Sequence, residues 1–258
     1  MKKTLVAFVH TFILAGAINV AHADDKVVFA IAQEPYPPFS YKDSSGVWSG
    51  FEPELITEVC KRMQADCSLK ELAWDGLIPA LRSKQVDVIM NSMSITPERE
   101  QVVDFTEPYI ETPALWVGDA ALELTPTPEG LEGKTIGVQG STSHSAYVKQ
   151  YFGKTSTIRY YNDQDDLLAD LRSGRIDIML ADKISVEPML ALPDNSMLAS
   201  KGVAPADPLF GKGIGAAVRK GDDALREKLN KALKAVREDG TYDAVGARYF
   251  KTTVSASQ

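Results

Sequence analysis

Histidine and cysteine are scarce in this sequence, which contains three histidines and two cysteines among 258 residues. His10 and His22 belong to the apolar N-terminal stretch, so His144 is the only imidazole left for acid–base chemistry or metal binding. No cysteine is close to it in the sequence, and protein zinc sites need several such ligands. We therefore expect no metal site and no cofactor.

Catalytic motifs are also missing. "GKGIGAA" (211–217) resembles a dinucleotide-binding loop, but a strand-like segment follows it where the motif needs a helix. "GSTSHS" (140–145) lacks the glycine that follows the serine of a nucleophile elbow. With no convincing catalytic set, the sequence indicates a binding protein rather than an enzyme.

Positive charge is in deficit, since 28 Lys and Arg residues face 35 Asp and Glu residues, a formal net charge of −7. Proteins that bind nucleic acid or anionic membrane surfaces typically carry an excess of basic residues. We expect neither partner here.

Long hydrophobic runs are absent except at the N-terminus. Lys2 and Lys3 precede an apolar run (4–20), and Ala21-His22-Ala23 forms a small-x-small cleavage site. This pattern is typical of a secretory signal peptide, so we predict that residues 1–23 are removed on export. A membrane anchor is the alternative, but polar residues interrupt a run that is barely long enough to span a bilayer.

The two cysteines, Cys60 and Cys67, lie in "CKRMQADC". Two cysteines in an exported chain suggest one disulfide. On a continuous helix they would be about 10 Å apart along the axis, beyond the roughly 7 Å that a disulfide can span between Cα atoms. The bridge therefore requires the helix to end near Ala65, with Cys67 in the next strand.

Strands and helices alternate along the chain, which predicts an α/β protein with largely parallel strands. The expected strands and helices follow the hydrophobic periodicity. Strands are expected at 26–32, 68–73, 86–90, 134–139, 156–161 and 176–181, and helices at 50–65, 74–84, 141–152, 163–174 and 222–240.

An internal repeat divides this series in two. "DGLIPALRSKQVDVIMNS" (75–92) aligns without gaps on "DDLLADLRSGRIDIMLAD" (165–182), and the shared residues recur 90 positions on. Proline-containing extended segments at 104–118 and 205–220 suit two crossings between similar lobes. We predict a first lobe made of 24–111 and 210–258, and a second lobe made of 112–209.

Ligands of open α/β sheets bind beyond the carboxyl ends of the strands. The repeat places Ser92 and Asp182 at equivalent strand ends, so the interlobe cleft should be lined by "NSMSITPER" (91–99), "VQGSTS" (138–143) and "LADK" (180–183). Thr96 and Pro97 suit a helix start. Arg99 in the first turn opposes the helix dipole, which favours an anion facing it; a salt bridge to a local glutamate is the alternative.

Two further features favour a ligand in this cleft. In "QGSTSHS" (139–145), Gly140 permits close backbone approach and Ser141 or Thr142 can cap a second helix, although capping alone explains the pattern. Tyr36 and Trp74 both fall on loops at strand ends, where aromatic side chains can contact a ligand. Burial of these rings in the core is the alternative.

The chain resembles the polar amino-acid-binding proteins of bacterial ABC importers, the lysine/arginine/ornithine-, histidine- and opine-binding group (solute-binding protein family 3). The likeness runs from Lys26 to Phe250 through an ordered set of motifs. These are "PYPPFSY", "GFEPEL", "CKRMQADC", "WDGLIPAL", "MSITPER", "GVQGST", "LRSGRIDIMLAD" and "EDGTYDAVGARYF".

This resemblance implies a type II periplasmic binding protein fold, in which two α/β lobes, each a mostly parallel sheet flanked by helices, are joined by two hinge strands. It also implies a periplasmic protein that closes on a polar, cationic amino acid or derivative, such as arginine, lysine, ornithine, histidine or an opine. Its implied partner is an inner-membrane ABC permease, and we expect a monomer. The paired cysteines match the family's disulfide.

The resemblance also implies roles for individual residues. Arg99 would hold the α-carboxylate with help from the turn at Thr142, and Asp182 would hold the α-ammonium with oxygens of 91–94. Aromatic rings would enclose the side chain. The full predicted set is Glu34, Tyr36, Trp74, Asn91, Ser92, Ser94, Arg99, Gln139, Thr142, Ser143 and Asp182.

Several positions depart from the family pattern. Gln33 stands where members that bind cationic side chains often have an acid, and the adjacent Glu34 could substitute for it. Asn91, Ser143 and Trp74 replace a common serine, glutamine and phenylalanine. These departures affect the identity of the ligand rather than the grip on its α-groups.

Two other functions fit the same resemblance. Some similar proteins are dehydratases of the cyclohexadienyl or arogenate type, for which Glu34 or His144 could supply the acid. The folded protein could also act as a ligand-binding sensor that signals to a kinase.

Overall fold

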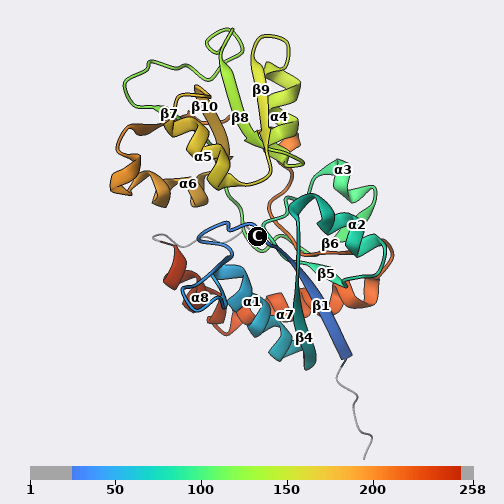
Figure 1. The fold of residues 1–258 in the computed structure, drawn as a ribbon. Helices are drawn as coiled ribbons and strands as arrows, with labels where there is room; N and C mark the ends of the chain where they lie inside the picture. The colour runs from blue at the N-terminus through green and yellow to red at the C-terminus, as the bar shows by residue number, and fades with distance from the viewer. Residues whose placement is uncertain (1–24, 251–258) are drawn as a thin grey trace, which may run out of the picture.

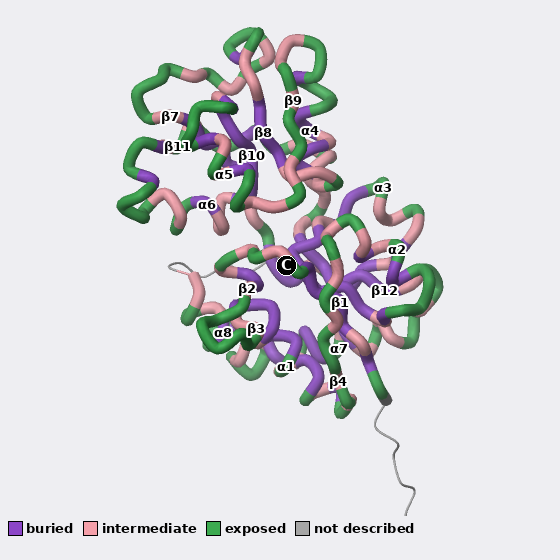
Figure 2. Tube along the Cα trace, viewed as in Figure 1, coloured by how far each residue is buried: buried purple, intermediate pink, exposed green. Residues whose placement is uncertain are grey.

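The computed structural model of the protein describes residues 25–250, and the predicted signal peptide lies outside this range. The chain forms two lobes, each built on a five-stranded sheet with helices on both faces (Figure 1). Buried residues follow the sheets and the inner sides of the helices, and exposed residues cover the outside (Figure 2). None of the helices in residues 25–250 has the length and apolar character of a membrane span.

The first lobe is the sheet ordered β4-β1-β5-β12-β6 with its helices. Helices pack on both faces of this sheet because side chains alternate along each strand. Phe29 of β1 meets the helices α1, α7 and α8, whereas Ala30 meets α2. The elements are β1 (Asp25–Ala32), α1 (Phe51–Met63), β4 (Ala65–Leu72), α2 (Leu77–Arg82), β5 (Val88–Ile89), α3 (Pro97–Glu100), β6 (Val103–Phe105), β12 (Ala217–Arg219), α7 (Asp223–Glu238) and α8 (Thr241–Tyr249).

The second lobe is the sheet ordered β11-β7-β10-β8-β9 with its helices. Trp116 of β7 packs with Phe152 of α4 on one face, and Val117 packs with Leu167 of α5 on the other. The elements are β7 (Ala114–Asp119), β8 (Thr135–Gln139), α4 (Ser143–Phe152), β9 (Thr157–Tyr161), α5 (Gln164–Arg172), β10 (Ile178–Asp182), α6 (Lys183–Leu190) and β11 (Leu198–Val203).

Each sheet is mostly parallel, as predicted, with one strand running against the others. That strand is β12 in the first lobe and β7 in the second, and both pair antiparallel with both neighbours. Each is the strand that the chain forms directly after it crosses between lobes. The two crossing segments also pair with each other, because Ile110 and Ile214 form an antiparallel bridge. The lobes are therefore joined by two adjacent hinge strands.

The structure bears out the internal repeat at the level of single hydrogen bonds. Asp87 accepts a bond from Val28 N at 3.0 Å, and its counterpart Asp177 accepts one from Thr135 N at 2.8 Å. In both cases the aspartate's own amide donates to the same neighbouring residue. The repeated aspartate, one residue before β5 or β10, thus ties the start of that strand to the neighbouring strand in each lobe.

The disulfide forms between Cys60 and Cys67, with Cα atoms 6.2 Å apart. Helix α1 ends at Met63 because Gln64 takes a left-handed conformation, φ 52°. The chain then reverses into β4, which contains Cys67. The predicted early end of the helix and the predicted pairing are both confirmed.

Some elements differ from the sequence prediction. The helix expected at 74–84 is split into a 3-10 turn (Trp74–Gly76) and α2, and the strand expected at 86–90 pairs only over β5. Helices α6 and α8 and strand β11 were not predicted. Helix α6 contains Pro188 and buries only Val186, so it lacks the apolar periodicity that reveals a helix. The remaining short elements are β2 (Tyr41–Lys42), β3 (Trp48–Ser49), η2 (Pro193–Asn195) and η3 (Pro208–Phe210).

Candidate ligand-binding site

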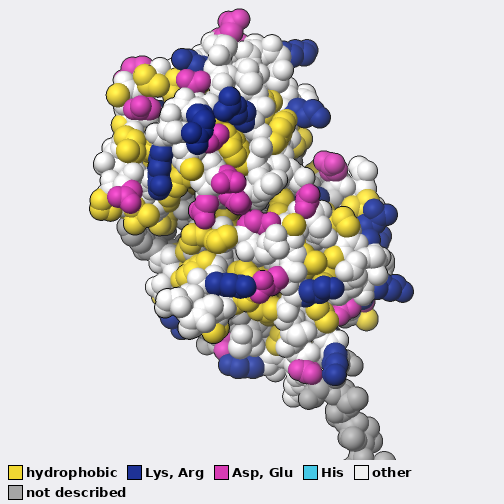
Figure 3. Space-filling view, viewed as in Figure 1, with side chains coloured by type: hydrophobic (Ala, Val, Ile, Leu, Met, Phe, Trp, Pro, Cys, Tyr) yellow, Lys and Arg dark blue, Asp and Glu magenta, His cyan; other side chains and the backbone are white. Residues whose placement is uncertain are grey.

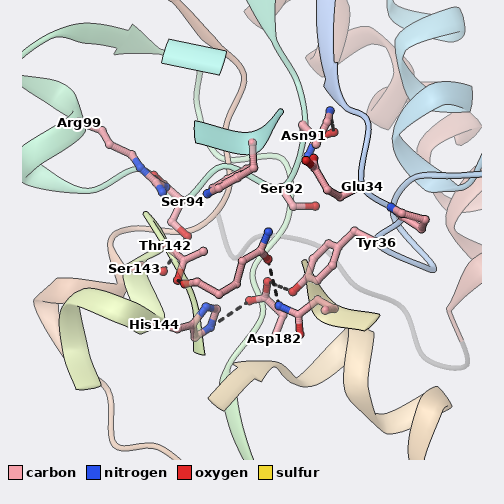
Figure 4. Close-up of a pocket in the computed structure, with 15 residues that line it drawn as sticks. Glu34, Tyr36, Asn91, Ser92, Ser94, Arg99, Thr142, Ser143, His144 and Asp182 are labelled. Carbon is pink, nitrogen blue, oxygen red and sulfur yellow. Dashed lines mark hydrogen bonds and ion pairs between the residues drawn. The ribbon is translucent and has the colours of Figure 1, made fainter. Parts of the chain in front are cut away.

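All eleven predicted site residues line one cavity between the two lobes (Figure 4). The strand-end argument explains this convergence, because β1, β5, β8 and β10 each deliver a loop to the same gap. Four residues outside the predicted set share the lining: Ala32, Pro35, His144 and Gln164. Within residues 25–250, no group of acidic, histidine or cysteine side chains is arranged to hold a metal ion.

Arg99 forms the cationic wall of the cavity. Thr96 caps the four-residue helix α3 by accepting from Arg99 N at 3.3 Å, which holds the backbone of the arginine in place. Its guanidinium donates to Ser94 O at 2.9 Å and to Ser141 O at 3.0 Å. Among the described residues it has no ion pair with a glutamate, so the alternative of a local salt bridge is not what the structure adopts. Burial lowers the pKa of Arg99 to about 10, which leaves it charged at neutral pH.

Asp182, at the end of β10, forms the anionic wall and is 8 % exposed. Tyr36 OH donates to its Oδ2 at 2.6 Å, and His144 Nε2 lies 3.6 Å from its Oδ1 (Figure 4). Burial raises the pKa of Asp182, and it lowers the pKa of His144 below its usual value, which favours a neutral imidazole. The carboxylate is thus oriented by two neighbours without being neutralised by a cation.

The start of α4 lines the cavity in the second lobe, as Asp182 does, and Arg99 lines it in the first lobe. Thr142 is its N-cap, and its hydroxyl and amide are both engaged with Ser145 in a capping box. The first-turn amides of Ser143 and His144 have no partner inside the helix, because the first amides of any helix lack one. The backbone of this turn, rather than the Thr142 hydroxyl, is therefore the part able to bind an anion.

The unusual backbone conformation in this turn belongs to Ser141, not to Gly140. Ser141 has φ 58°, in the left-handed region that non-glycine residues rarely adopt. A side chain at Gly140 would make only ordinary contacts, 3.7 Å or more from its neighbours. The capping role is that of Thr142 rather than Ser141.

Asn91 and Ser92 form the floor in the first lobe. Asn91 Oδ1 accepts from Ala32 N at 2.8 Å, which ties the ends of β5 and β1 together. Ser92 has φ 49°, and its amide and hydroxyl both donate to Glu52 Oε1, at 2.5 and 3.1 Å. Tyr109 OH, from the first crossing segment, donates to the same oxygen at 2.5 Å.

Sequence reasoning missed Glu52. It is fully buried, and desolvation raises its pKa to about 7 despite the three donated hydrogen bonds. A signal was present, because Glu52, Leu55 and Val59 have the i, i+3, i+7 spacing that places all three on the buried face of α1. A buried acid on such a face needs hydrogen-bond donors. Here they are Ser92 of the cavity floor and Tyr109 of the first crossing segment.

A third part of the cavity carries unpartnered acceptors. Glu34 Oε2 and Gln164 Oε1 are buried and have no hydrogen-bond partner. The Gln164 amide group is held by a bond from its Nε2 to Gln139 Oε1 at 3.0 Å. Arg99 and Glu34 lie on opposite sides of the cavity (Figure 4). Both unpartnered oxygens call for N–H or O–H donors.

The two lobes touch across the cavity. Ser94 Oγ and Ser143 Oγ are 3.2 Å apart, and Ser185 of α6 donates to Pro37 O at 2.9 Å. With the bonds from Tyr36 to Asp182 and from Arg99 to Ser141, these contacts hold the lobes closed.

Residues 28–252 match the bacterial extracellular solute-binding proteins, family 3. The chain belongs to this family. A relative from Escherichia coli K12, the putative ABC transporter arginine-binding protein 2, is 38% identical over 252 residues, which cover 97% of this chain and 100% of the relative. The histidine-binding periplasmic protein of the same organism is 36% identical over 255 residues, 97% of each chain.

Solved structures of similar binding proteins agree with the fold. An ancestral arginine-binding protein bound to arginine superposes with a TM-score of 0.81 at 31% identity, covering 89% of this chain and 100% of that one. The relatives are named as binding proteins and not as enzymes. This family 3 chain is accordingly a solute-binding protein, and the dehydratase alternative is not retained.

Proposed function

We propose that the protein captures a free, polar, cationic amino acid or amino-acid derivative between its two closing lobes. The observation that carries this proposal is the pairing of opposite charges across one closed cavity, with Arg99 on one wall and Asp182 on the other. An α-amino acid is a compact zwitterion, and its two charged groups match this arrangement.

The α-carboxylate would lie between the Arg99 guanidinium and the first-turn amides of α4. A guanidinium can give a carboxylate two parallel hydrogen bonds, and a helix start favours negative charge. The α-ammonium would lie against Asp182, whose carboxylate has no cationic partner among the described side chains at neutral pH.

The side chain of the ligand would extend toward Glu34 and Gln164, beside the ring of Trp74. Their buried acceptor oxygens favour a side chain that ends in several N–H donors, such as a guanidinium or an ammonium. Acidic side chains also gather at the junction of the lobes on the face shown in Figure 3, which would attract a cation. Glu34 thereby takes the role that an acid at position 33 would have.

No single contact suffices for tight binding. Micromolar affinity corresponds to about −8 kcal/mol, whereas one hydrogen bond to a charged group contributes about 1.5–3 kcal/mol. The proposal therefore requires both ends of the ligand and the closure of the lobes.

We further propose that the protein is periplasmic, that residues 1–23 are its cleaved signal peptide, and that it acts as a monomer that delivers its ligand to an inner-membrane ABC permease. The names of the relatives support the location and the transporter. The proposed lobe boundaries, 24–111 with 210–258 and 112–209, are supported by the fact that each sheet takes its strands from one of these sets. Nucleic acid is not a proposed partner, because the chain is acidic.

Calorimetry with arginine, lysine, ornithine, histidine and glutamine tests the two ends of the site separately. We expect Arg99→Ala to lower affinity for every ligand by about 100-fold or more, because the ligand's α-carboxylate then lies at the start of α4 without a cationic partner. We expect Glu34→Gln to weaken the cationic ligands by about tenfold and glutamine by less than threefold. Undiminished affinity in Arg99→Ala would contradict the proposed site.

A further inference from the structure

The backbone carbonyl of Ser141 is the meeting point of two donors from the opposite lobe. The indole Nε1 of Trp74 donates to it at 3.3 Å, and Arg99 Nη2 donates to it at 3.0 Å. The guanidinium carbon of Arg99 also lies 5.5 Å from the centre of the Trp74 ring. Ser141 belongs to the second lobe, whereas Trp74 and Arg99 belong to the first.

The conformation of Ser141 is what turns this carbonyl toward the first lobe. Ser141 is an exposed, non-glycine residue at φ 58°, which costs roughly 1–2 kcal/mol for an L-amino acid. Nothing in the local capping of α4 requires the residue itself, since Thr142 and Ser145 complete the cap. The two hydrogen bonds across the cleft are the contacts that offset this cost.

We propose that Trp74 is a closure-stabilising residue, whose indole N–H and Arg99 together hold the Ser141 carbonyl and thereby slow the opening of the lobes. A phenylalanine could stack on a ligand at this position but could not make this bond. Because Arg99 is also the proposed carboxylate ligand, the same side chain couples occupancy of the site to closure. This inference rests on the proposed capture of an amino acid between closing lobes.

The test is the dissociation rate of arginine, measured by stopped flow on Trp74→Phe. This variant keeps an aromatic ring and loses the N–H donor, so we expect dissociation to be about three- to tenfold faster, as loss of one hydrogen bond allows. The association rate should stay within twofold, because closure follows binding. Trp48→Phe is the matched control: it removes an indole N–H that bonds Glu71 at 3.0 Å within the first lobe, and both rates should stay within twofold.

A comparison of ligands separates closure from stacking. Loss of a closing contact speeds the release of arginine and glutamine by the same factor. Loss of ring stacking changes the two release rates by different factors, because the two ligand side chains contact the ring to different extents. A wild-type dissociation rate in Trp74→Phe, an equal acceleration in Trp48→Phe, or a factor that differs between ligands would overturn the proposal. If the wild type bound none of these amino acids, the proposed function itself would fail, which is a distinct outcome.

The unmutated protein supplies a second measurement that does not depend on a variant folding. Indole N–H resonances of Trp74 and Trp48 can be followed by NMR with and without arginine. We expect slowed hydrogen exchange at the Trp74 indole when arginine is bound and no change at Trp48. Unchanged exchange at Trp74 would contradict its role in closure.

Discussion

Residues 75–92 of the first lobe and 165–182 of the second form a similar helix, turn and strand, yet only their last residues reach the cavity. Along the shared part, Asp87 and Asp177 make the same pair of hydrogen bonds to the neighbouring strand. At the ends, the first lobe presents Asn91 and Ser92, and the second presents Asp182. The aspartate that recurs in the repeat joins neighbouring strands within each lobe, whereas the end residues, which differ between the two copies, line the site.

The reason lies in the geometry of a parallel sheet. Interior positions of the repeat face the same kind of neighbour in both lobes, whereas the two strand ends face each other across the cleft and must complement a single ligand. An asymmetric ligand with a cation at one end of its backbone and an anion at the other needs two different walls. Asp182 and Arg99 supply them from opposite lobes.

Asp182→Asn should give the largest contrast between the two strand ends. It removes the charge of the proposed anionic partner of the ligand's ammonium, so we expect affinity to fall by about 30- to 1,000-fold, equivalent to about 2–4 kcal/mol. Stability should not fall, because burial already disfavours the charged form of Asp182. The counterpart change, Ser92→Ala, should weaken binding by less than tenfold. Calorimetry and thermal unfolding of both variants would measure this, and equal losses of affinity would refute the assigned asymmetry.

Glu52 sharpens the comparison, because this buried carboxyl lies beneath the strand end of the first lobe. Its ordinary pKa of 4.5 is raised to about 7 in the folded protein by desolvation. Below pH 4.5 it is protonated in both the folded and the unfolded state. Between pH 4.5 and about 7 the unfolded state releases this proton while the folded state keeps it, so stability falls across this window and levels off above it. The wild type should therefore lose up to about 3 kcal/mol more between pH 4.5 and 8 than Glu52→Gln does.

Urea unfolding of the wild type and Glu52→Gln at several pH values would measure that difference. Subtracting the free energy of unfolding of one protein from that of the other cancels the contributions of other titrating groups, including His144. Parallel pH profiles would show that folding does not raise the pKa of Glu52.

Asp87→Asn and Asp177→Asn probe the shared part of the repeat and should have the smallest effects. Each weakens a tie between two strands, so we expect losses of about 1–2 kcal/mol in the free energy of unfolding. Asp87 should lose more, because Arg219 lies 3.1 Å from it, whereas Lys134 lies 3.7 Å from Asp177 and is more exposed. Arginine affinity should stay within twofold in both variants, and a larger change would break the division between scaffold and site.

Much of the fold could be predicted because its signals are local in sequence. Apolar periodicity located six of the strands and five of the helices, and the seven-residue spacing of Cys60 and Cys67 required α1 to end close to Gln64. The strand-end rule predicted the cleft, the resemblance to the solute-binding family supplied the full set of eleven residues, and all eleven line one cavity. Helix α6 escaped detection because its pattern is weak, and strand β11 has mostly exposed or half-buried residues.

The amino-acid sequence by itself determined the two similar α/β lobes, their two crossings, the disulfide and the identity of the residues at the cavity. Only the tertiary structure decided how those residues act on one another. The pairing of Tyr36 with Asp182 joins residues 146 positions apart, and the bond from Trp74 to Ser141 spans 67. Such contacts depend on how the lobes meet rather than on any local pattern, because the energy that selects them comes from burial and hydrogen bonding between distant segments.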